Sequence, residues 1–184
     1  MNAGEDEVSR ALAEPVELAD YDPDWPAAFE AEAGRLEHLL ANIPIGRIEH
    51  IGSTAVPGLT AKPIIDLMVE VPDYECVRQR IAPILRAAGY DFFWRPVTPG
   101  DVEIDYAWFL KRDAAGRRTH HVHVAPPGSR YWDRVTFRDR LRADPSLAAD
   151  YAAVKRAALT GSDGDRAAYA RAKSAFIRRV LAGD

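Results

Sequence analysis

The segment from residue 64 to 71, IIDLMVEV, restricts the fold most, because nearly every residue in it is apolar. A strand with one solvated face alternates apolar and polar residues, whereas an apolar run of this length is typical of a strand covered on both faces. We therefore predict a central β-strand over 64–71. Asp66 interrupts the run, and a buried carboxylate must be hydrogen-bonded, paired with a cation or bound to a metal. A structural salt bridge and a metal ligand are both open for it.

The other elements follow from hydrophobic periodicity and from the residues at helix ends. The pattern predicts helices over 24–42, 73–87, 129–142, 145–160 and 163–182. It predicts strands over 47–52, 90–95, 102–111 and 119–125, with an extended segment at 15–20 and a hairpin turn at 112–117. This order predicts an α+β fold, with a mixed sheet of about five strands flanked by helices and a C-terminal helical segment.

Length and composition limit the class of protein. The chain has 184 residues, of which 47% are hydrophobic and 28% charged, so we expect one globular domain over 14–184 after a flexible tail at 1–13. A lone Cys76 excludes disulfides within the chain and all-cysteine zinc sites. No apolar window approaches the roughly 18 residues of a membrane span, and the acidic N-terminus lacks an apolar run. We expect a cytoplasmic protein without a membrane partner.

Charge is distributed unevenly along the chain. Residues 1–32 contain ten Asp or Glu and one Arg, whereas residues 117–184 contain fourteen Lys or Arg and seven Asp. The basic C-terminal part either presents solvated helix faces or offers cations to a phosphate-bearing ligand. Because the pI is about 5.8, we do not expect the protein to bind nucleic acid.

Between two predicted strands lies a Pro/Gly-rich loop that carries candidate ligand-binding residues. Gly52 would let a phosphate approach the backbone, and Ser53 could donate its hydroxyl and its backbone N–H. Lys62 places a cation just before the strand that contains Asp66. The spacing does not match a P-loop, because the G-x-x-x-x-G-K-[ST] pattern is missing.

A second group of candidates lies on the predicted hairpin. His121 and His123 are two residues apart and project from one face of their strand, whereas His120 points to the other face. Glu103 and Asp105 have the same relation on the preceding strand. With Asp66 these residues could bind a divalent metal, and imidazole ligands suit Zn²⁺ or Mn²⁺ better than Mg²⁺. Alternatively, the histidines are hydrogen-bonded sheet residues or bind phosphate as cations. His50 could join the site or be a hydrogen-bonded residue at a strand end.

The C-terminal helices repeat a spacing of four residues. Phe137 and Leu141 are expected to pack on the sheet, whereas basic residues form a parallel ridge at Arg134, Arg138 and Arg142. The same spacing joins Tyr to Lys in two pairs, Tyr151 with Lys155 and Tyr169 with Lys173. Elsewhere, we assign Trp94 and Trp108 to the core, and the alternative is that they stack on a nucleotide base.

Together, HIGSTAVPGLTAKPIIDL (50–67), RTHHVHV (118–124) and FRDRLR (137–142) resemble the GrpB family, also called UPF0157. The resemblance extends over about 160 residues. It implies a nucleotidyltransferase-like fold, and it implies a partner protein, because similar domains extend some dephospho-CoA kinases. In such folds a helical C-terminal part commonly closes over the nucleotide, which implies phosphate contacts from Arg138, Lys155 and Lys173. The other expected roles are catalysis by Ser53, Lys62 and Asp66, phosphate binding by Gly52, Ser53 and Lys62, and metal binding by Asp66, Glu103, Asp105, His121 and His123.

One position departs from the superfamily pattern, which places a second carboxylate two residues after the first. Met68 stands there, and Glu70 is about 13 Å from Asp66 along the strand. A two-metal mechanism needs closely set carboxylates, so the departure weakens the transferase hypothesis. Three hypotheses follow: a metal-dependent nucleotidyltransferase-like protein with Mg, Mn or Zn, a non-catalytic domain that binds a phosphate ligand or supports a partner, and a His/Asp metal-dependent hydrolase or phosphotransferase.

Overall fold

The computed structural model describes residues 17–95, 106–161 and 166–183. One mixed sheet has the strand order β1-β2-β5-β4-β3, and its strands are β1 (Ile48–Ile51), β2 (Ile65–Glu70), β3 (Asp91–Arg95), β4 (Tyr106–Arg112) and β5 (Arg118–Ala125). The helices are α2 (Trp25–Leu39), α3 (Tyr74–Cys76), α4 (Ala82–Ala87), α5 (Asp133–Ala143), α6 (Pro145–Gly161) and α7 (Arg166–Ala182). Shorter turns are η1 (Ser53–Ala55), η2 (Val77–Ile81) and η3 (Arg130–Trp132). The predicted α+β fold with a C-terminal helical segment is confirmed.

Strand β2 is internal, as its apolar sequence predicts. It pairs antiparallel with β1 and parallel with β5, which in turn pairs antiparallel with β4. The parallel register places Asp66 beside His121 and Met68 beside His123. Because side chains alternate across a strand, these four residues lie on one face of the sheet.

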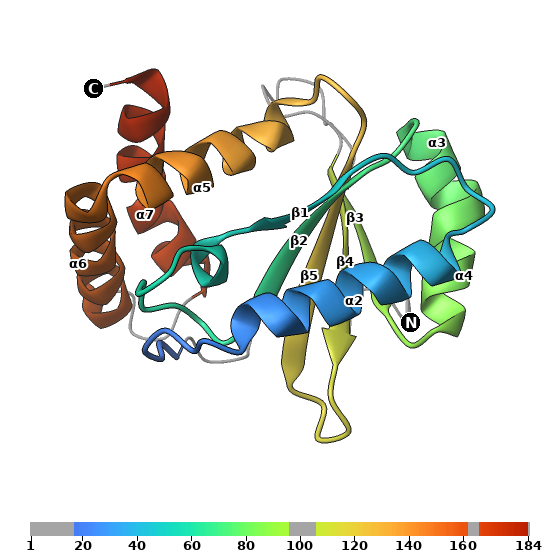
Figure 1. Ribbon diagram of the computed structural model, residues 1–184, viewed down its shortest axis with the longest axis horizontal. Helices are drawn as coiled ribbons and strands as arrows, with labels where there is room; N and C mark the ends of the chain where they lie inside the picture. Colours follow the sequence, from blue (N-terminus) through green and yellow to red (C-terminus); the bar gives the residue numbers. More distant parts are fainter. Residues whose placement is uncertain (1–16, 96–105, 162–165, 184) are drawn as a thin grey trace.

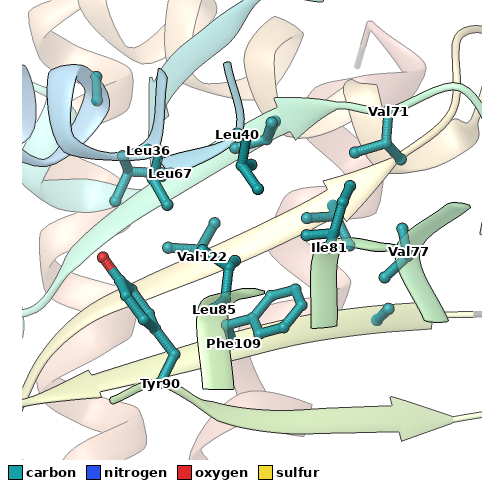
Figure 2. Close-up of a cluster of buried hydrophobic side chains, with 14 of the residues drawn as sticks. Leu36, Leu40, Leu67, Val71, Val77, Ile81, Leu85, Tyr90, Phe109 and Val122 are labelled. Carbon is teal, nitrogen blue, oxygen red and sulfur yellow. The ribbon is translucent and has the colours of Figure 1, made fainter. Parts of the chain in front are cut away.

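The opposite face of the sheet forms the main hydrophobic core. Figure 2 shows Leu67, Val122 and Phe109 from three strands against Leu36 of α2 and Leu85 of α4. All five side chains are fully buried. Figure 1 shows α2 running across the strands, with α3 and α4 beside its far end. This core fixes the orientation of the sheet and leaves the Asp66 face for other contacts.

Helices α5, α6 and α7 form a second unit next to the β1 edge of the sheet (Figure 1). The sequence predicts that Phe137 and Leu141 of α5 pack on the sheet, and this prediction is wrong. They pack instead among loop residues and the other two helices, in a cluster that contains Val56, Leu59, Tyr151, Ala152, Phe176 and Val180. The reason is that α5 contacts β1 through Arg138, so its apolar side is available to α6 and α7.

The predicted helix over 73–87 is divided into three parts. Asp73 caps it by accepting a hydrogen bond from the Cys76 N–H, as helix-start residues do. A π-helical turn, η2, then separates α3 from α4. Pro83 accounts for the change, because it lacks the N–H of a regular helical bond and its ring clashes with the carbonyl four residues earlier.

Some predictions fall outside the described residues. They are the flexible tail over 1–13 and the candidate metal ligands Glu103 and Asp105. The single-domain organisation over 14–184 likewise stays a prediction. Among the helices that the structure describes, none combines the length and apolarity required to cross a membrane.

Candidate metal and phosphate site

A cavity of about 670 Å³ opens between the sheet, the loop after β1 and the C-terminal helices. Asp66, His121 and His123 line it from the sheet, and Gly52, Ser53 and Lys62 line it from the loop. Lys155 of α6 and Lys173 of α7 line it from the helices. The fold therefore brings together eight of the candidates that the sequence suggests, although they are spread over more than 120 residues of chain.

Asp66, His121 and His123 form a compact triad. Asp66 Oδ1 is 3.1 Å from His121 Nδ1 and 3.6 Å from His123 Nε2. Ligand atoms about 2.1 Å from one ion in tetrahedral geometry are about 3.4 Å from each other, so these spacings fit a shared cation. Among the described residues, His121 Nε2 is buried without a hydrogen-bond partner. Two imidazoles and a carboxylate are the donor set of a borderline transition metal.

Protonation states in the triad also fit metal binding. Burial raises the pKa of the Asp66 carboxyl, but hydrogen bonds with His121 and His123 outweigh it and hold that pKa well below its usual range. Burial lowers the pKa of His123 to about 4, against a smaller opposing effect of Asp66. At neutral pH the site therefore has an ionised carboxylate and a neutral His123, the forms that coordinate metals.

Gly52 determines the position of Asp66. Its φ is +71°, a conformation that side chains disfavour, and a Cβ there would lie 2.4 Å from Asp66 Oδ2. We had expected Gly52 to make room for a phosphate. The structure shows that its missing side chain first makes room for the carboxylate.

Lysines surround an aromatic ring at the helical wall. The Nζ atoms of Lys62 and Lys173 lie 4.6 and 4.2 Å from the centre of the Tyr169 ring. Lys155 is 2% exposed and donates to the Thr60 carbonyl. Burial, aided by the charges of Lys173 and Arg156, lowers the pKa of Lys155 to about 7. Burial lowers the pKa of Lys173 to about 8, although Asp66 opposes this. Clustered ammonium groups with lowered pKa values are stabilised when an anion binds.

Of the two candidates Arg138 and Ser53, only Ser53 lines the cavity. Arg138 does not line this cavity: it donates to Glu49 Oε2 at 2.8 Å, to the His50 carbonyl at 2.6 Å and to Asp139 Oδ1 at 2.8 Å. The bonds to Glu49 and His50 attach α5 to β1. Ser53, in contrast, lines the cavity.

The remaining candidates have structural partners. Met68 is fully buried in an apolar cluster with Ile51, Ala125 and Trp132. It therefore does not take over the role of the second carboxylate that the superfamily pattern places at this position. Glu70 pairs with Arg47 at 3.4 Å. The buried His50 ring stacks on Phe29 and forms a hydrogen bond with Thr54 Oγ1 at 3.0 Å. Of the two alternatives for His50, the structure therefore agrees with the hydrogen-bonded residue at a strand end.

Trp94 agrees with the core assignment, because it packs on the main core with Tyr74. Trp108 is partly buried, and its ring stacks on Phe93 with centroids 5.2 Å apart.

Sequence reasoning missed several residues of the cavity wall. Tyr151 and Tyr169 line it beside the lysines four residues later, and that spacing was the available signal. Arg130 and Arg178 also line it, and nothing in their sequence context distinguished them. Arg134 was identified in the basic ridge but had no assigned role.

Comparison with known proteins relates this geometry to a family. Residues 15–182 match the GrpB protein family. A UPF0157 protein of Pseudomonas aeruginosa is 41% identical over 175 residues, which cover 94% of this chain and 69% of the relative. The crystal structure of the conserved protein GrpB from Enterococcus faecalis superposes with a TM-score of 0.76 at 30% identity, over 91% of this chain and 96% of that one.

Two further similarities cover a smaller share of the other protein. A dephospho-CoA kinase of Mycolicibacterium paratuberculosis is 35% identical over 89% of this chain, but the match spans only 44% of the kinase. The Cid1 poly(U) polymerase with MgGTP bound superposes with a TM-score of 0.51 at 14% identity, over 74% of this chain and 43% of the polymerase. The second similarity shows a shared nucleotidyltransferase-like fold.

Proposed function

Because the chain belongs to the GrpB protein family, whose fold is nucleotidyltransferase-like, we propose that it binds a nucleotide together with a divalent metal ion and transfers the nucleotidyl group to an acceptor. One observation carries the proposal: a carboxylate–imidazole triad and three lysines line the same cavity. The triad offers metal ligands, and the lysines offer the positive charge that a triphosphate needs. The binding of MgGTP by Cid1, which shares the fold, supports this assignment.

Seven residues that line the cavity have a role in the proposal. Asp66, His121 and His123 would hold the ion, which when bound would neutralise charge on phosphate oxygens as a Lewis acid. Lys62, Lys155 and Lys173 contact the remaining phosphate oxygens. Ser53 donates its hydroxyl and its backbone N–H to a phosphate. Catalysis by such a site consists of positioning and electrostatic stabilisation.

A second function, ligand binding without turnover, is favoured by Met68. This residue fills the position of a second carboxylate and is buried among apolar side chains. The described residues therefore provide one triad, suited to one ion, whereas paired ions need a further acid. Such a protein would support a partner enzyme, as the match to part of a dephospho-CoA kinase suggests. The cytoplasmic location expected from the sequence stays a prediction.

Binding is tested first by thermal unfolding. Protein treated with a chelator is resupplied with Mg²⁺, Mn²⁺ or Zn²⁺, with and without each nucleoside triphosphate. A ligand at 100 times its Kd stabilises the folded state by about 2.7 kcal/mol, which raises the Tm by several degrees. We expect a rise that requires both metal and nucleotide, and that disappears in Asp66→Asn and in the double variant His121→Ala/His123→Ala.

Pyrophosphate release then separates the two functions. Release that depends on Asp66 supports transfer, and stabilisation without release supports the binding function. A shift with Zn²⁺ or Mn²⁺ alone, lost only in the histidine variant, would instead favour a metal-dependent hydrolase or phosphotransferase. No shift under any condition would contradict the proposal.

A further inference from the structure

We propose that the cavity has a second anion-binding subsite, formed by Arg130 and Arg134, and that the acceptor of the transfer reaction therefore carries a phosphate group. This inference rests on the proposed function and specifies its substrate class. Both arginines line the cavity, from η3 and from the first turn of α5. They are four residues apart, a spacing that places side chains on one face of a helix.

The two arginines enter the cavity from a different element than the lysines. Lys155 and Lys173 belong to α6 and α7, and Lys62 belongs to the loop before β2. Arg134 is held in place by the ring of Tyr131, whose centre is 4.8 Å from the Arg134 Cζ atom, and Tyr131 also lines the cavity. The cavity thus has two separate cationic walls.

The carboxylate–imidazole triad is within electrostatic reach of both walls. Lys173 interacts electrostatically with Asp66, whereas Arg134 interacts electrostatically with His123. In a transfer reaction the attacking oxygen of the acceptor and the leaving phosphates of the donor lie on opposite sides of the reacting phosphorus. If the donor triphosphate occupies the lysine wall, the acceptor occupies the arginine wall.

Charge and chemistry indicate what the arginine wall binds. The cavity lining contains six lysines or arginines but two aspartates, Asp66 and Asp133. Arginine binds phosphate through two parallel N–H donors, whereas lysine acts as a compact point charge. A phosphate group of the acceptor therefore suits Arg130 and Arg134.

The reaction in this arrangement is balanced without another reagent. An acceptor hydroxyl oxygen forms a bond to the α-phosphorus, and the bond from that phosphorus to the bridging β-phosphate oxygen breaks. Pyrophosphate leaves with the bonding electrons, and the hydroxyl proton passes to solvent. The phosphate group of the acceptor does not react, and it positions the hydroxyl by binding the arginines.

Inorganic phosphate is the probe for this subsite. The protein is first saturated with Mn²⁺ and a non-hydrolysable nucleoside triphosphate analogue, so that the lysine wall is occupied. Phosphate is then titrated calorimetrically into the wild type, Arg130→Gln/Arg134→Gln and Lys173→Gln. Arg86→Gln is the matched control, because Arg86 is exposed on α4 and does not line the cavity.

We expect phosphate to bind together with the analogue, and Arg130→Gln/Arg134→Gln to weaken phosphate binding at least tenfold. The Kd for the analogue should change less than threefold in that variant but at least tenfold in Lys173→Gln. The conservative change Arg134→Lys should weaken phosphate less than Arg134→Gln. If the double variant does not fold, the two single variants replace it, each with an expected loss of about threefold.

Two results would overturn the inference: displacement of the analogue by phosphate, or unchanged phosphate binding in the arginine variants. Failure of the proposed function gives a different result. In that case the analogue does not bind with any metal, and phosphate binding to the otherwise empty protein shows whether the arginine subsite exists without a nucleotide.

Discussion

At the scale of single residues, Gly52 and Asp66 depend on each other. The carboxylate lies where the side chain of any other residue at position 52 would be, and the backbone there has a positive φ. Steric conflict and backbone strain therefore act at the same position. The consequence is that position 52 affects both stability and metal affinity.

Gly52→Ala should lower the free energy of unfolding by about 2–4 kcal/mol and weaken Mn²⁺ binding at least tenfold. Gly58→Ala is the matched control, because Gly58 has a φ of +75° but a Cβ added there would meet no atom within 4 Å. We expect that control to lose about 1 kcal/mol and to bind Mn²⁺ as the wild type does. Urea unfolding and metal titration measure the two effects, and equal losses in both variants would contradict the steric argument.

Lys155 should make stability depend on pH. Its pKa falls from 10.5 to about 7 on folding, mainly through burial. Between these values the unfolded chain binds more protons than the folded one, so the free energy of unfolding rises with pH. From pH 7 to 9 we expect Lys155 to contribute a rise of about 2 kcal/mol, and Lys155→Met should lose this contribution.

Urea unfolding at pH 7, 8 and 9 measures this slope. Lys173→Met serves for comparison, because the pKa of Lys173 falls only to about 8. Lys173 therefore contributes to the rise in the free energy of unfolding mainly above that pH. Parallel slopes for the wild type and Lys155→Met would show that Lys155 does not titrate in this range.

At the scale of elements, basic side chains of α5 and α6 attach these helices to the backbone of β1 and of the loop between β1 and β2. Arg138 donates to the His50 carbonyl at 2.6 Å, and Arg142 donates to the Ala55 carbonyl at 2.8 Å. Lys155 donates to the Thr60 carbonyl. Carbonyl oxygens that accept these charge-assisted bonds fix the path of the loop, and with it the position of Gly52 and Ser53.

Arg138→Met should therefore affect stability more than binding. It leaves Glu49 and the His50 carbonyl without their donor, and we expect a loss of about 2–4 kcal/mol in the free energy of unfolding. The nucleotide Kd of the folded protein should change less than threefold, whereas Lys173→Met should change it at least tenfold. Urea unfolding and calorimetric titration measure the two quantities. A tenfold change of Kd in Arg138→Met would restore Arg138 as a direct phosphate ligand.

At the scale of the whole molecule, the two faces of the sheet have different roles. One face packs on α2, α3 and α4 in the main core, and the other presents Asp66 to a cavity closed by α5, α6 and α7. Along β2 and β5, residues of the site alternate with residues of the core. Leu67 follows Asp66 on β2, Val122 lies between His121 and His123 on β5, and both apolar side chains are buried in the core.

Ligand binding should reduce amide exchange in α6 and α7. A nucleotide held by both the sheet and these helices must dissociate before the helices can separate from the sheet, so local opening becomes rarer. With Mn²⁺ and a nucleotide analogue, we expect slower hydrogen exchange over 145–161 and 166–182, and little change in α2. Asp66→Asn is the control and should show no effect. Protection confined to α2 would contradict this arrangement of the site.

Much of the fold followed from the sequence by itself. The apolar run 64–71 predicted the internal strand, and period-two spacing correctly placed His121 and His123 on one face with His120 on the other. Local patterns suffice here because side-chain direction in a strand depends only on its own backbone geometry. The motif around Gly52 and Asp66 likewise identified the family.

Tertiary structure decided the partners of the charged and aromatic residues. Arg134, Arg138 and Arg142 share one helical spacing, yet the first lines the cavity, the second binds a backbone carbonyl of β1 and the third binds one of the segment after β1. The apolar side of α5 faces helices instead of the sheet. Spacing along a helix defines a face, but which element covers that face depends on packing between segments far apart in the chain.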